Sequence, residues 1–120
     1  MLIEQRIQKA LENVLDVNIY YRTAPATDDD YVVIFKVSHN PSHSMGGDSG
    51  FASSVIQVST YSKSYATAKG IKEKVRKELQ NKSDDNIQAV NYENEIDMYD
   101  DNTKQYHVAQ DFQVFHVEGF

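Results

Sequence analysis

Apolar residues recur along the chain with two different periods, and the change of period separates helices from strands. The first segment places Ile3, Ile7, Leu11 and Val14 three or four residues apart, with charged residues mostly between them. That spacing puts the apolar side chains on one face of a helix. It predicts a first helix over about Leu2–Leu15.

The same helical period returns in the middle of the chain, directly after a strand pattern. Val55–Tyr61 is rich in β-branched and aromatic residues and predicts a strand. The polar turn Ser62–Ser64 follows, and a second helix is predicted over Tyr65–Gln80. Its apolar stripe consists of Tyr65, Ala68, Ile71, Val75 and Leu79.

Four further segments have strand character. Val17–Arg22 is short, whereas Tyr31–Val37 is a near-continuous apolar run typical of a buried strand. Ile87–Tyr99 and Tyr106–Val117 are longer, and Asp100–Thr103 between them has the composition of a hairpin turn.

The last predicted strand alternates imperfectly. Phe112, Val114 and His116 would share one face, and Phe115 and Val117 the other, so we expect a bulge in this strand. His107 and His116 are an odd number of residues apart, which places them on opposite faces.

The predicted order of elements is α-β-β-β-α-β-β. Because hairpins join antiparallel neighbours, this order predicts an α+β fold, a two-layer sandwich with two helices on one face of a mostly antiparallel sheet. The other face would be solvated or covered by a partner. The predicted strands contain Tyr20, Tyr21, Tyr61, Tyr92, Tyr99 and Tyr106. They suit an interface on the open face, or equally an ordinary core with cross-strand pairs.

A long polar stretch, His39–Ser53, separates two strands and predicts a loop. Loops of this length usually have a function or become ordered on binding. His39, His43, Asp48 and Ser49 lie in it, the last two within a Gly-Asp-Ser-Gly sequence. A metal site or a serine hydrolase is one interpretation, but His-x3-His spacing favours metal on a helix, and the trypsin-like enzymes with this motif are about twice as long.

Length and composition narrow the possible classes. The chain has 120 residues, a formal net charge of -6 and no cysteine. We expect one domain over residues 1–120 and no disulfide or thiolate metal site. The negative net charge repels nucleic acid and disfavours binding to phosphates that is independent of sequence. The first residues lack the pattern of a signal peptide, and no apolar run is long enough to cross a bilayer, so we expect a soluble protein made inside the cell.

Charge is distributed unevenly along the second half of the chain. Between residues 63 and 82 there are seven basic residues, and between 83 and 101 there are seven acidic residues and no basic one. These segments fit two solvated surfaces. They also fit a contact in which the basic helix of one copy meets the acidic hairpin of the next, a head-to-tail arrangement that can close into a ring.

The strand, turn and helix together carry a resemblance to a known family. The stretch VIQVSTYSKSYATAKGIKEKVRKEL resembles the core of the tail completion, or tail terminator, proteins of long-tailed bacteriophages. The Pro-bearing loop Thr23–Thr27, the strand Tyr31–Ile34 and the closing stretch YDDNTKQYHVAQDFQVFHV are similar to the same family.

The resemblance implies assembly, with no enzyme activity and no cofactor. It implies a virion protein at the head–tail junction, assembled in the host cytoplasm, that forms a hexameric ring. The ring would end the tail tube, join the tail to the head-completion or connector protein, and let genomic DNA pass without specific binding. No membrane partner is expected.

Two groups of residues are candidates for these contacts. The predicted docking loop for tube or connector contains His39, Asn40, His43, Met45, Asp48 and Phe51. The predicted ring interface contains Lys69, Lys72, Arg76, Lys77, Glu93, Glu95, Asp97 and Asp100. Another neck component, such as a head-closure or minor capsid protein, is an alternative function. A small hydrolase or metal-dependent enzyme using residues 39–50 is a further one.

Overall fold

A computed structural model describes residues 3–22, 29–44, 47–80 and 87–117; within these ranges the side chains of residues 39–44, 47–51, 88 and 117 lie outside the description. The helices are α1 (Ile3–Glu12) and α2 (Tyr65–Leu79). The strands are β1 (Asn18–Tyr21), β2 (Tyr31–Ser44), β3 (Gly47–Ser62), β4 (Ile87–Asp100) and β5 (Gln105–Val117). The predicted order α-β-β-β-α-β-β is confirmed.

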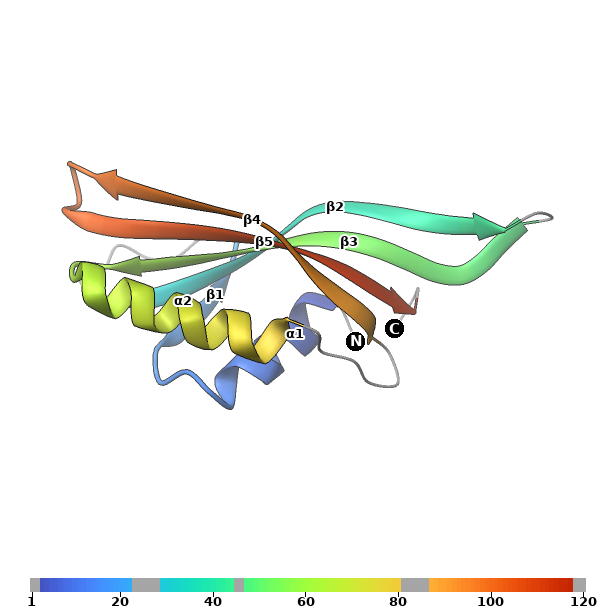
Figure 1. Ribbon diagram of the computed structural model, residues 1–120, viewed down its shortest axis with the longest axis horizontal. Coiled ribbons are helices and arrows are strands. Elements are labelled where there is room, and N and C mark those ends of the chain that lie inside the picture. The colour runs from blue at the N-terminus through green and yellow to red at the C-terminus, as the bar shows by residue number, and fades with distance from the viewer. Residues whose placement is uncertain (1–2, 23–28, 45–46, 81–86, 118–120) are drawn as a thin grey trace.

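One sheet contains all five strands, in the order β1-β2-β3-β5-β4. β1 runs parallel to β2, and every other neighbouring pair is antiparallel. Both helices lie against the same face of this sheet (Figure 1). The predicted two-layer α+β sandwich is therefore confirmed.

The core fills the space between the helices and the sheet. Ile7 and Leu11 of α1 and Val75 of α2 are fully buried there against Ile56 and Val58 of β3. Alternate residues of each strand enter this layer, and the residues between them lie on the opposite, open face.

Helix α2 begins where a polar side chain can cap it. The Ser64 hydroxyl accepts a hydrogen bond from the backbone N–H of Thr67 at 3.3 Å. Ala68, Ile71, Val75 and Leu79 are buried as the spacing predicts, but Tyr65 is 49% exposed. Tyr65 is the first residue of the helix, and its ring lies against that of Tyr106.

The predicted loop His39–Ser53 is wrong. Apart from residues 45–46, which lie outside the description, this stretch is strand, and β2 and β3 continue to pair through it with Pro41 opposite Ala52. The pairing joins backbone groups and does not need an apolar repeat, so small polar residues can form it. The Pro-bearing loop predicted at Thr23–Thr27 also lies outside the described residues.

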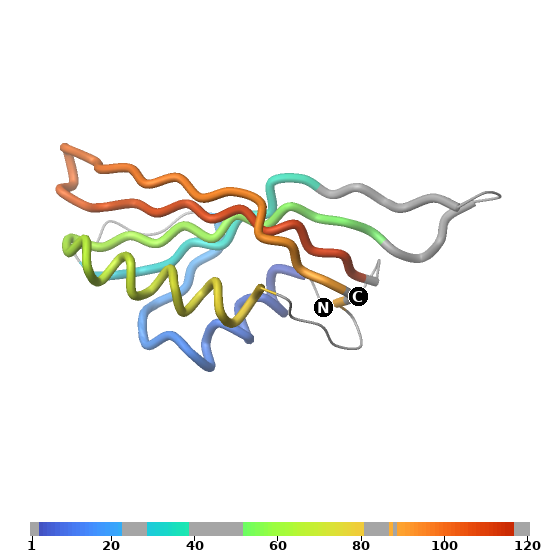
Figure 2. Tube along the Cα trace, in the orientation of Figure 1, coloured from blue at the N-terminus to red at the C-terminus, as the bar shows by residue number. Residues whose placement is uncertain are grey.

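The two long strands β4 and β5 pair from Ile87 to Asp100 of β4 and run side by side in Figure 2. The register shifts lie at Ile87/Ala89 and Tyr92/Asn94, so the bulges are in β4. The bulge predicted in β5 is wrong, because β5 keeps one continuous register with β3.

The two histidines of β5 lie on opposite faces, as predicted. His116 is buried on the helix side, where its Nε2 lies 2.8 Å from Ser54 Oγ. His107 lies on the open face and stacks on Tyr61 with ring centroids 4.2 Å apart. The odd number of residues between them accounts for this division.

The strand tyrosines divide between the faces. Tyr20 and Tyr61 lie on the open face with Tyr31, whereas the helix side holds Tyr21, Tyr92, Tyr99 and Tyr106. The cross-strand pairs are present, since Tyr61 stacks on Tyr31 and Tyr99 contacts Tyr106, whereas an interface on the open face stays a prediction.

Candidate assembly surfaces

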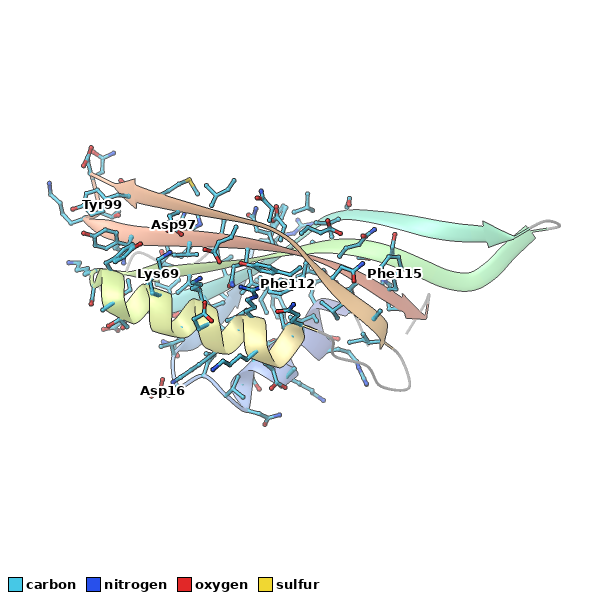
Figure 3. All side chains as sticks on the ribbon, in the orientation of Figure 1. Asp16, Lys69, Asp97, Tyr99, Phe112 and Phe115 are labelled. Carbon is cyan, nitrogen blue, oxygen red and sulfur yellow. The ribbon has the colours of Figure 1, made fainter. Side chains whose placement is uncertain are left out.

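The basic helix and the acidic hairpin meet within one chain. Lys69 Nζ of α2 lies 2.5 Å from Asp97 Oδ2 of β4, and the two side chains point toward each other in Figure 3. One helical turn further along, Lys72 Nζ lies 3.1 Å from Glu95 Oε1. The two lysines are three residues apart on one face of the helix, and the two acidic residues are two residues apart on one face of the strand. Successive ion pairs can therefore form along α2 and β4.

Hydrogen bonds from β4 and β5 extend this charged cluster into the core. Glu95 Oε1 also accepts a hydrogen bond of 2.5 Å from the Tyr92 hydroxyl. The Gln110 side chain is fully buried, and its Nε2 donates to the backbone carbonyl of Lys72 at 3.1 Å. The Arg76 guanidinium lies over the Tyr92 ring, 4.6 Å from its centroid. The cluster therefore holds α2 against β4 and β5.

The contacts of this cluster shift the pKa values of Glu95 and Lys72. Partial burial would by itself raise the pKa of Glu95, but the hydrogen bonds from Tyr92 and Lys72 outweigh it and lower that pKa. The pKa of Lys72 is raised, first by its hydrogen bond to Glu73 and also by Glu95, against the effect of burial. Both groups are thus held in their charged forms.

The predicted ring-interface residues divide into two groups. Lys69, Lys72, Glu95 and Asp97 pair with one another inside the chain, and Arg76 donates from Nε to Gln80 Oε1 at 2.9 Å. The charge complementarity that suggested a contact between copies is thus largely used within one copy. Lys77, Glu93 and Asp100 are exposed.

The residues predicted for docking have backbone positions only. His39, Asn40 and His43 lie in β2, Asp48 and Phe51 in β3, and none of their side chains is described. Met45 lies outside the described residues. Among the side chains that are described, no three His, Cys, Asp or Glu residues gather as they would around a metal ion.

An aromatic column on the open face is a feature that the sequence pattern did not reveal. Tyr31 stacks on Tyr61 with centroids 4.7 Å apart, and Tyr61 stacks on His107. Burial lowers the pKa of His107, which a weaker interaction with Asp100 opposes. Tyr31 lies opposite Tyr61, and Tyr61 lies opposite His107, in the register of β2, β3 and β5. The column can therefore be predicted only when the pairing of these three strands is known.

No helix in the described part of the chain is long and apolar enough to cross a membrane.

No protein-family model matches the sequence, and no curated protein does either. Among solved structures, the fold is similar to a chain of a particle described as "Virion of native gene transfer agent (GTA) particle". The TM-score is 0.66 with 13% sequence identity, over 98% of this chain and 95% of that chain. This likeness shows a shared fold that extends over almost all of both chains.

Proposed function

We propose that this chain is a structural protein of a phage-like virion and has no enzymatic role. The observation that carries the proposal is the fold likeness to a chain of a gene transfer agent virion, which spans 98% of this chain. A match over nearly the whole length favours a common role for the whole domain, which we take to be residues 1–120. The sequence resemblance to tail terminator proteins, made from different information, points to the same class.

Within that class we propose a position at the head–tail junction. The chain would form a hexameric ring that ends the tail tube and joins the tail to the connector, with DNA passing through the lumen. The exposed charges Lys77, Glu93 and Asp100 remain candidates for contacts between copies. The distal part of the β2–β3 hairpin, which carries His39, Asn40, His43, Asp48 and Phe51, is our candidate for docking onto tube or connector. Met45, which lies outside the described residues, belongs to the same predicted set.

Native mass spectrometry and negative-stain microscopy of the purified protein, with and without its tail tube protein, test this function. We expect rings, and tubes that carry a ring at one end and stop growing. Binding to the portal complex and not to tube ends would identify another neck component. A monomer at all concentrations, even with tube protein present, would contradict the ring.

A further inference from the structure

Two strand edges on opposite sides of the sheet lack a strand partner in the described part of the chain. β4 is the last strand of the sheet, so within the described residues no strand pairs with its outer edge. On the other side, β1 pairs only with Tyr31–Ile34 of β2. From Phe35 onward, no strand among the described residues pairs with the outer edge of β2. Unpaired edges of this length present rows of backbone donors and acceptors to a further strand.

Exposed apolar side chains accompany both edges. Phe35 and Val37 of β2 are 40% and 53% exposed, and Ile96 and Met98 of β4 are 48% and 44% exposed. Phe35, Ile96 and Met98 belong to the open face, because the register aligns Phe35 with Gln57, Ile96 with Ala109 and Met98 with His107. At these open-face positions the edges carry apolar side chains where a protected edge often carries charges.

The two strands also differ in charge. β4 contains four acidic residues and no basic one, with Glu93 and Asp100 exposed beside the paired Glu95 and Asp97. β2 contains Lys36 and no acidic residue. Approach of one strand to the other would therefore be electrostatically favourable, whereas two copies of β4 would repel each other.

We propose that the outer edge of β4 in one copy pairs with the outer edge of β2, from Phe35 onward, in a second copy. The sheet would continue from one subunit to the next and would join Ile96 and Met98 to Phe35 and Val37. The two edges are different surfaces of one chain, so the contact is head-to-tail and repeats around a ring. This inference rests on the proposed ring and names the surfaces that build it.

Cysteine cross-linking tests the pairing directly, since the chain has no cysteine. Within one copy β3 and β5 separate β2 from β4. Three strand spacings of about 4.8 Å exceed the Cα separation that a disulfide allows. A disulfide between these strands can thus form only between copies.

A panel of double variants covers the possible registers. It combines Phe35→Cys or Val37→Cys with Asn94→Cys, Ile96→Cys or Met98→Cys, and each protein is oxidised under assembly conditions. We expect at least one pair to give a ladder of multimers on a non-reducing gel, collapsing to monomer on reduction. The control combines Phe35→Cys with Val14→Cys. Val14 is an exposed residue on the helix side, so this pair should give no ladder.

The outcomes separate the edge pairing between copies from the proposed function as a tail terminator. A disulfide dimer of the single variant Met98→Cys would indicate β4–β4 pairing and overturn the inference. Rings without a ladder from any pair would also overturn it while leaving the virion function standing. A ladder from a protein that never caps tubes would support the edge pairing and contradict the tail terminator. A ladder that forms only with a cysteine-bearing strand of the tube protein would identify that protein as the occupant and overturn the pairing between copies.

Discussion

Lys72 Nζ and Glu95 Oε1 lie 3.1 Å apart within one chain, joining the central turns of α2 to the edge strand β4. The Lys72 side chain retains 12% of its exposure and that of Glu95 retains 24%. Water screens opposite charges less in this partly buried setting than it screens a fully solvated pair. The pair therefore contributes to the fold of the single subunit before it can contribute to any contact between subunits.

Replacing Lys72 should destabilise the subunit itself. We expect Lys72→Met to lower the free energy of unfolding by about 1 kcal/mol, because the partly buried Glu95 then loses its nearer cation and keeps only the 3.8 Å contact with Lys69. Urea denaturation followed by circular dichroism measures the change. Lys77→Met, an exposed position on the same helix, is the matched control and should change the value by less than about 0.5 kcal/mol. Equal losses in both variants would contradict a specific role for the pair.

Glu95 predicts a dependence of stability on pH. Its pKa is lower in the folded chain than in the unfolded chain, so folding favours the ionised form. The resulting stability is fully present above the unfolded pKa of about 4.3 and is lost as the pH falls through the folded pKa. The difference in stability between the wild type and Glu95→Gln should therefore be largest at pH 7 and shrink as the pH falls below about 4. A difference that stays constant over this range would show that ionisation of Glu95 has no part in stability.

The sequence predicted the elements whose side chains enter the core, because burial leaves a period that can be read. Ile7, Leu11, Ile71 and Val75 recur at helical spacing and are buried. The distal part of the β2–β3 hairpin was missed because it is held by backbone pairing of small polar residues. The partner of Lys72 was also missed, since a charge pattern along the chain does not tell whether opposite charges meet within a subunit or between subunits.

Two phenylalanines of β5 offer a test of the two faces of the sheet. Phe112 is fully buried on the helix side, 5.1 Å from the Tyr92 ring centroid, whereas Phe115 lies on the open face and is only partly buried (Figure 3). We expect Phe112→Ala to cost about 3–5 kcal/mol, from lost burial and the cavity it leaves. Phe115→Ala in the same strand should cost less than half as much. Thermal and urea unfolding measure both, and similar losses would contradict the assignment of the core to the helix side.

The turn between β4 and β5 contains a residue in the left-handed region. Lys104 has a φ of 59° while its N–H donates to the Asp100 carbonyl at 2.8 Å. A residue other than glycine in this conformation destabilises the folded chain by about 1–2 kcal/mol. Glycine would remove this strain, but its greater freedom in the unfolded chain would cancel part of the gain.

We therefore expect Lys104→Gly to raise the free energy of unfolding by about 0.5–1 kcal/mol, measured by urea denaturation. Thr103→Gly is the matched control, because Thr103 is in the same turn without a positive φ. It should lower stability, since glycine there gains only unfolded-state freedom. A loss in both variants would show that the conformation of Lys104 carries no strain that glycine can relieve.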